Sequence, residues 1–126
     1  VPVQNVKGFG LEKIELTGDY FDQTLAAAQA FCAEKGAHFL SPFDDPDVIE
    51  GQATCALEFL EDQPNLEILM APVGGGGLLG GTALTAHYLN PQIEVIAGEP
   101  TGADDAYRSF HAGYIIPQTG PTTIAD

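Results

Sequence analysis

The sequence predicts an α/β protein, with a mostly parallel sheet carrying helices on both faces. Segments with the apolar spacing of helices alternate with short segments typical of strands. Residues 66–73 are apolar at nearly every position, as expected for a strand covered on both faces. Four consecutive glycines follow at 74–77 and lead directly into another helical segment.

The first 41 residues predict a strand, a helix and a second strand. Residues 12–16 alternate between polar and apolar side chains, which favours a half-buried strand. Asp19 is placed to cap the following helix, and Gly36 can adopt the left-handed conformation that ends one. A short strand is expected at 38–40. The apolar positions of the helix recur at helical spacing: Phe21, Leu25, Ala28 and Cys32.

The loop 41–46 separates this part from the rest, so we expect one lobe at 1–41 and a second at 42–126. Asp45 is placed to cap a helix whose first residue is Pro46. After the strand at 66–73 we expect a helix at 78–89, a strand at 93–97 and a helix at about 103–111. The helix after Pro46 has one apolar face: Val48, Ile49, Ala53, Ala56, Leu57 and Leu60.

The composition excludes several classes of protein. The chain has 126 residues, 44% of them hydrophobic, but no apolar run near the roughly 18 residues needed to cross a bilayer. No membrane segment or secretory signal is therefore predicted, and a cytoplasmic location is the default expectation. The formal net charge of −14 would repel nucleic acid and anionic lipid. Cys32 and Cys55 have no metal or redox spacing and are expected to be buried free thiols.

The glycine run, defined as Gly74, Gly75, Gly76 and Gly77, predicts a phosphate-binding loop. Glycines between a strand and a helix let the backbone approach an anion, while N–H groups and the helix dipole face it. The same segment also fits a dinucleotide pattern, because Gly75, Gly77 and Gly80 have G-x-G-x-x-G spacing and Glu99 lies about 20 residues on. A flexible linker is the less specific alternative, whereas a Walker loop is excluded because no Gly-Lys-Ser/Thr follows.

Ordered blocks around the glycine run give the sequence a family resemblance. These are FDDPDVIEGQ at 43–52, PVGGGGL at 72–78, GEPTGADD at 98–105 and TIAD at 123–126, with GFG at 8–10 and GDYFD at 18–22 before them. In content and order they resemble the pyridoxal-phosphate-dependent serine/threonine dehydratases and serine racemases. The resemblance runs through nearly the whole chain and implies part of the fold-type II (tryptophan synthase β-like) fold, with 1–41 in the auxiliary lobe and 42–126 in the cofactor lobe.

The resemblance implies that the glycine run and Leu78 hold the phosphate of pyridoxal 5′-phosphate. The cofactor would withdraw electrons from the α-carbon of an amino-acid substrate. Loss of the α-proton and the β-hydroxyl would release ammonia, whereas reprotonation on the opposite face would racemise the substrate. The same resemblance implies that Mg²⁺, Mn²⁺ or Ca²⁺ would be bound by Glu99, the Ala103 carbonyl and Asp105. It also implies that the protein forms a homodimer.

The lysine that forms the family's Schiff base is missing from this sequence. Family members carry it in a Ser-x-Lys-x-Arg-Gly-Ala-like segment upstream of the matched region, whereas the lysines here are Lys7, Lys13 and Lys35. We therefore assign no catalytic residue and expect an internal fragment that is inactive alone. The chain also departs from the family pattern at Ala53 and Gly80. Two alternatives stay open: a nicotinamide-binding domain of an oxidoreductase, and a non-catalytic remnant that binds an anion or a metal.

Overall fold

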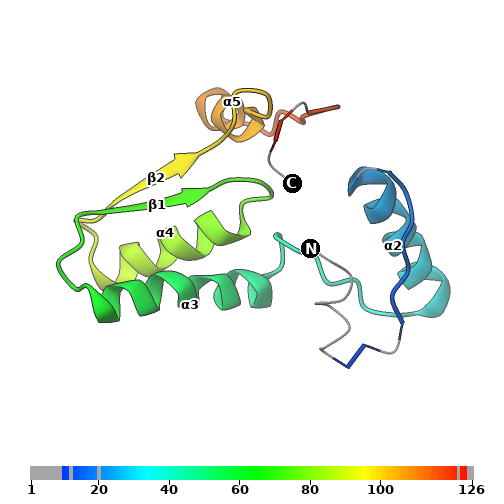
Figure 1. Cartoon of the computed structure of the whole chain (residues 1–126), viewed down its shortest axis with the longest axis horizontal. Helices are drawn as coiled ribbons and strands as arrows, with labels where there is room; N and C mark the ends of the chain where they lie inside the picture. Colours follow the sequence, from blue (N-terminus) through cyan, green and yellow to red (C-terminus); the bar gives the residue numbers. More distant parts are fainter. Residues whose placement is uncertain (1–9, 12, 20, 122, 125–126) are drawn as a thin grey trace. The chain divides into compact units, whose positions relative to one another are not determined.

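A computed structural model describes residues 10–11, 13–19, 21–121 and 123–124 of the chain. By its internal contacts the chain divides into two compact units, Val1–Leu40 and Ser41–Asp126. Figure 1 shows the helices and strands of both units. Each unit is described by itself below.

The first unit contains one helix, α2 (Phe21–Lys35), among the residues that the structure describes. The helix confirms the prediction, and Gly36 follows it with a φ of 64°, in the left-handed region that ends a helix. The strands predicted at 12–16 and 38–40 are wrong for residues 13–16 and 38–40, which form no ladder; residue 12 lies outside the described residues. A strand needs a hydrogen-bonded neighbour, and neither segment has one in the described part of this unit.

The second unit is built around a strand–helix–strand motif. Its described elements are α3 (Pro46–Asp62), β1 (Ile68–Pro72), α4 (Gly77–Leu89), β2 (Glu94–Gly98) and α5 (Asp105–Ala112). The two strands pair in parallel, from Ile68 opposite Glu94 to Pro72 opposite Gly98, and α4 connects them (Figure 1). The α/β class, the parallel pairing and the order of these elements were predicted correctly.

The core of the second unit lies between the sheet and the α3–α4 pair. The helices approach so closely that a Cβ on Gly81 would lie 2.5 Å from the Ala53 backbone nitrogen. The Thr85 hydroxyl lies 3.1 Å from the Ala53 carbonyl oxygen and adds a polar contact between the helices. The buried hydrophobic cluster consists of Ala56, Leu60, Leu69, Ala86 and Ile93, with Leu66 and Val95 packed against it.

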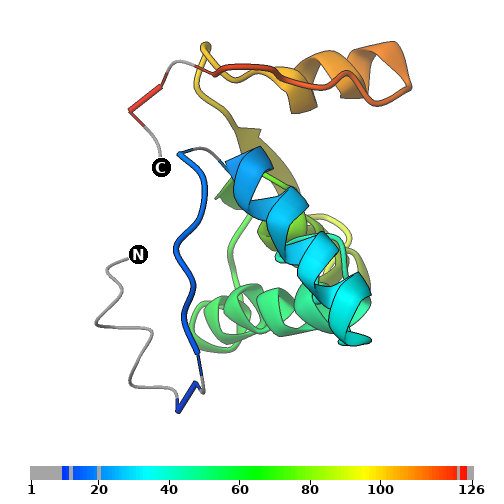
Figure 2. The ribbon, with the colours of Figure 1, turned by 90° about the vertical axis from the view of Figure 1, so that its right-hand side faces the viewer.

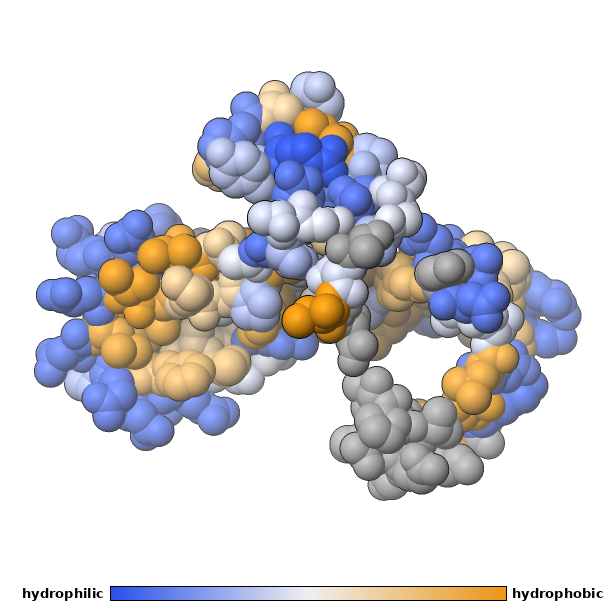
Figure 3. Space-filling view, turned by 45° about the horizontal axis from the view of Figure 1, so that its top comes forward, coloured by the Kyte–Doolittle hydropathy of each residue, from blue (hydrophilic) through white to orange (hydrophobic). Residues whose placement is uncertain are grey.

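The sheet is covered on one face only in the described part of the chain. Leu69 and Ala71 are buried toward the helices, whereas Ile68 is 51% and Met70 is 72% exposed on the other face. Hydrophobic surface is visible beside the hydrophilic rim of this unit in Figure 3. The expectation that β1 is covered on both faces is therefore wrong for these residues, because α3 and α4 pack on the same side.

The N-terminus of α3 forms as predicted. Asp45 has an extended backbone, and its side chain accepts a hydrogen bond from the Asp47 N–H at 3.0 Å, with Pro46 at the start of the helix. This satisfies one of the N–H groups that a helix leaves unpaired.

The prediction of buried thiols is wrong for Cys55, which is exposed on α3, and Cys32 is only partly buried.

The segment after α5 runs back along that helix (Figure 2). The Ile116 N–H donates to the Ser109 hydroxyl oxygen at 2.8 Å, and the Arg108 guanidinium donates to both Asp104 and Gln118. These contacts hold the segment against the helix.

Among the described residues, no helix is long and apolar enough to cross a membrane.

Candidate phosphate-binding site

The structure places the glycine run at the carboxyl end of β1 and the amino end of α4. The Val73 N–H donates to the Gly98 carbonyl at 2.9 Å and extends the β1–β2 pairing up to the run. Gly76 is the residue before the first turn of α4 and has a φ of 93°. A side chain at that φ would be strained, so this position requires glycine for its backbone conformation.

The run presents unpaired backbone donors. The Gly80 N–H donates to the Gly76 carbonyl at 2.8 Å, which begins the hydrogen bonding of α4. Within the described part of the chain, the N–H groups of residues 74–79 donate to no protein oxygen, and no side chain caps this end of the helix. The unpaired donors and the positive end of the helix dipole both favour an anion.

The two sides of the run differ in how closely they are packed. A Cβ on Gly75 would lie 2.0 Å from Cγ of Phe43, and one on Gly77 would lie 3.0 Å from the Phe43 carbonyl oxygen. A Cβ on Gly74 or Gly76 would meet no atom within 4 Å. One side is therefore closed by Phe43 while the other is open, so the residues present fit a phosphate group approaching from the open side.

Phe43 was missed as a site residue by the sequence analysis. The residue stands at the start of the 43–52 block, two positions before the cap of α3. That block was interpreted only as part of the family resemblance. Its proximity to the glycine run, more than thirty positions away along the chain, is a tertiary contact that neither periodicity nor spacing predicts.

A largely apolar cavity of about 560 Å³ lies next to the run in the same unit. Val73, immediately before the glycines, and Leu79, in the first turn of α4, form part of its wall. The remaining wall comes from β2, the loop after it and α5: Ala97, Glu99, Thr101, Asp104, Ala106, Tyr107 and Phe110.

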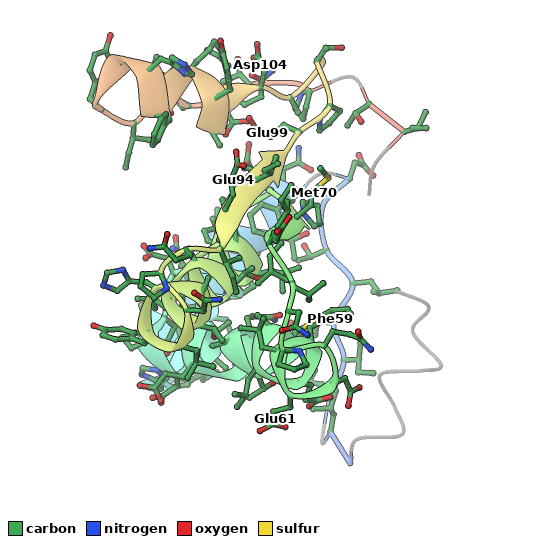
Figure 4. The ribbon with its side chains drawn as sticks, turned by 90° about the vertical axis from the view of Figure 1, so that its left-hand side faces the viewer. Phe59, Glu61, Met70, Glu94, Glu99 and Asp104 are labelled. Carbon is green, nitrogen blue, oxygen red and sulfur yellow. The ribbon has the colours of Figure 1, made fainter. Side chains whose placement is uncertain are left out.

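Glu99 has a structural role at the start of α5. Its two carboxylate oxygens accept hydrogen bonds from the Ala106 N–H at 3.1 Å and the Tyr107 N–H at 2.8 Å. Figure 4 shows Glu99 just beyond β2, with Asp104 at the near end of α5. Asp105 is the first residue of that helix.

The cation site expected at Glu99, Ala103 and Asp105 is not established by this geometry. Among the residues that the structure describes, no group of three or more His, Cys, Asp or Glu side chains is arranged to hold a metal ion. The Ala103 N–H donates to the Pro100 carbonyl at 2.9 Å, which shapes the turn that carries its own carbonyl.

Two lysines can be located, and both lie in the first unit. Lys13 pairs with Glu15 and Lys35 pairs with Glu34 at 2.6 Å, and all four side chains are more than half exposed. Lys7 lies outside the described residues. Neither described lysine lies in the kind of desolvated pocket in which an amine performs covalent chemistry.

Comparison with known proteins identifies the relatives of the chain. Residues 3–126 match the family model described as "Pyridoxal-phosphate dependent enzyme". The chain is 51% identical over 105 residues to a beta-hydroxyaspartate dehydratase of Paracoccus denitrificans, which covers 83% of this chain and 32% of that protein. It is 54% identical over 89 residues to a serine racemase of Dictyostelium discoideum, which covers 69% and 28%.

A solved structure shares the fold at similar coverage. The processed form of threonine deaminase isoform 2 from Solanum lycopersicum superposes with a TM-score of 0.89 and 32% identity, over 98% of this chain and 34% of that one. The chain thus spans about a third of the length of the relatives that it matches.

Proposed function

Because this chain belongs to the pyridoxal-phosphate-dependent enzyme family, we propose that it supplies the phosphate-binding part of an enzyme acting on hydroxy amino acids. The proposed reaction is the release of ammonia from serine, threonine or hydroxyaspartate, or the racemisation of serine. The names of the relatives support this substrate class.

The observation that carries the proposal is the set of unpaired N–H groups at residues 74–79. The glycine run and Leu78 would hold the phosphate through these donors, on the side where Gly74 and Gly76 are open. When bound, pyridoxal phosphate supplies the electron sink that labilises the bonds at the amino acid's α-carbon. The contribution of this chain is to bind and orient the phosphate end.

The chain alone is proposed to lack activity. Its lysines are Lys7, Lys13 and Lys35, and the two that the structure describes are exposed and paired with glutamates. The test is to mix the chain with pyridoxal phosphate, reduce the mixture with borohydride and map adducts by peptide mass analysis. We expect no single preferred lysine and no serine-dependent ammonia release; a specific adduct together with ammonia release would overturn this part of the proposal.

The nicotinamide-binding alternative finds no support in the comparisons, whose family model and relatives are pyridoxal-phosphate enzymes or amino-acid dehydratases and racemases. A binding experiment separates the two directly. The chain is titrated with pyridoxal phosphate and, separately, with NADH, the fluorescent form of NAD, while the fluorescence of each cofactor is followed. We expect binding of pyridoxal phosphate that inorganic phosphate displaces. Binding of NAD that free pyridoxal phosphate does not displace would refute the proposal.

A divalent cation at Glu99, the Ala103 carbonyl and Asp105 is a second part of the proposal. A carboxylate has about four lone-pair positions, so Glu99 can accept its two N–H bonds and still offer oxygen to Mg²⁺, Mn²⁺ or Ca²⁺. The melting temperature of the chain should rise with added Mg²⁺ or Ca²⁺. An Asp105→Asn variant should lose that rise, with Asp62→Asn as a matched control at the end of α3. An equal rise in both variants would refute a site at Asp105.

Three further expectations remain proposals. The division of the chain at Leu40 and Ser41 supports placing 1–41 in an auxiliary lobe and 42–126 in the cofactor lobe. A homodimer is proposed from the family resemblance and is tested by light scattering on the chain after size separation. A cytoplasmic location is proposed from the amino-acid chemistry of the relatives and is tested by cell fractionation.

A further inference from the structure

We propose that Phe43 is a positioning residue for the phosphate: its ring supports the glycine run from behind and fixes the direction of the N–H donors. This inference rests on the proposed function, because it assigns a role to a residue of the same site. No contact between Phe43 and the cofactor is part of the proposal.

The Phe43 ring packs directly against the glycine run. A Cβ on Gly75 would lie 2.0, 2.2 and 2.6 Å from Cγ, Cδ1 and Cδ2 of the Phe43 ring, so the ring occupies the space that a side chain at Gly75 would need. A Cβ on Gly77 would lie 3.0 Å from the Phe43 carbonyl oxygen and 3.1 Å from its Cα. One residue therefore packs against two alternate glycines and leaves the other two open.

The loop that carries Phe43 is held on both sides. On one side, the Asp44 N–H donates to the Ser41 hydroxyl oxygen at 3.0 Å. On the other, Asp45 caps α3 through the Asp47 N–H. Since α3 packs directly on α4, the ring and the helix that follows the glycines belong to one packed body. Phe43 is thus a fixed support for the run.

Four glycines in succession need such a support. Glycine loses more conformational freedom on ordering than any other residue, and a run of glycines has no side chains of its own to pack. Donors that must be ordered when the anion binds give weaker binding than donors held in place beforehand. The ring of Phe43 can restrict the run without occupying its open side.

The experiment measures the affinity of the full chain for inorganic phosphate and for pyridoxal phosphate, by calorimetry and by ³¹P NMR. The variants are Phe43→Leu, Phe43→Ala, Phe43→Tyr, Gly75→Ala and the double variant Phe43→Ala/Gly75→Ala. Gly51→Ala, on exposed helix surface where a Cβ would meet nothing within 4 Å, is the matched glycine control. The melting temperature of each variant is recorded, and binding is measured well below it.

The expected result is a weakening of phosphate binding by about tenfold or more in Phe43→Leu, comparable to the loss of one charge-assisted hydrogen bond. The Phe43→Tyr variant, which keeps the ring, should bind like the parent chain. Gly75→Ala should also weaken binding, but by much less when Phe43 has already been replaced by alanine, because alanine lacks the Cγ, Cδ1 and Cδ2 atoms that a Cβ on Gly75 would meet. Gly51→Ala should leave the affinity unchanged.

Failure of this inference differs from failure of the proposed function. A parent chain that binds neither inorganic phosphate nor pyridoxal phosphate overturns both. If the parent chain binds but Phe43→Leu binds equally well at a lower melting temperature, Phe43 has a purely structural role and only the positioning role is overturned. Independent effects of Phe43→Ala and Gly75→Ala would also overturn it, since the proposal requires the two sites to be coupled.

Discussion

Gly81 and Gly80 are adjacent in α4, yet substitution by alanine should shift stability in opposite directions. A Cβ on Gly81 would lie 2.5 Å from the Ala53 nitrogen and 2.8 Å from the Ile49 carbonyl oxygen, both of them backbone atoms of α3. At Gly80 the nearest atom would be Cγ2 of Ile49 at 3.9 Å, an ordinary contact. Only at Gly81 must the two helices separate to admit a methyl group.

The magnitudes follow from two opposing effects. Replacing glycine by alanine inside a helix stabilises it by about 0.8–1 kcal/mol, and this is the whole effect expected for Gly80→Ala. Overpacking of a well-packed core costs about 1–3 kcal/mol, and backbone atoms yield less than flexible side chains. Gly81→Ala should therefore lower the free energy of unfolding by about 1–2 kcal/mol, since the steric cost at a backbone contact exceeds the gain in helix propensity.

Urea denaturation, followed by circular dichroism, measures the free energy of unfolding of both variants and of the parent chain. For a unit of this size, each 1 kcal/mol corresponds to a shift of about 4–8 °C in melting temperature, so thermal denaturation provides a second measurement. Equal shifts in the same direction for the two variants would refute the close α3–α4 contact, because helix propensity alone treats the two positions alike.

Three further outcomes are expected. Asp45→Ala should lower the free energy of unfolding by about 1 kcal/mol through loss of the α3 cap, whereas Asp44→Ala, which removes no side-chain cap of this helix, should change it little; similar losses would contradict this. Glu99→Ala should speed amide exchange at Ala106 and Tyr107, which lose their acceptors; unchanged exchange would exclude Glu99 as the cap. Adding about 0.5 M NaCl should raise the melting temperature by screening the net charge of −14, and a fall would argue against charge repulsion.

The elements of the second unit could be predicted because their signals are local. Pro46 after Asp45 marks the start of α3, and the glycine run separates an apolar strand from a helix with boundaries within two residues of those observed. The family blocks added the prediction that the anion is the phosphate of pyridoxal 5′-phosphate. These features depend on residues that are close together in the sequence.

The failures concern contacts between distant residues. The alternating segment at 12–16 has the pattern of a strand, but the described residues 13–16 have no partner strand. The apolar segment of β1 suggested two covered faces, but Ile68 and Met70 are exposed because both packed helices lie on the opposite side. The role of Phe43 depends on a tertiary contact with Gly75 and Gly77 for which the sequence contains no local signal.

The exposed face of the sheet affects how the chain behaves at high concentration. Ile68 and Met70 form apolar surface beside two paired strands, and an apolar strand surface is a template for self-association. The excess of acidic side chains keeps molecules apart in dilute buffer. Salt that screens this repulsion should therefore raise the melting temperature and, at the same time, bring the uncovered faces of neighbouring molecules together. Colloidal and conformational stability are thus expected to respond to ionic strength in opposite directions.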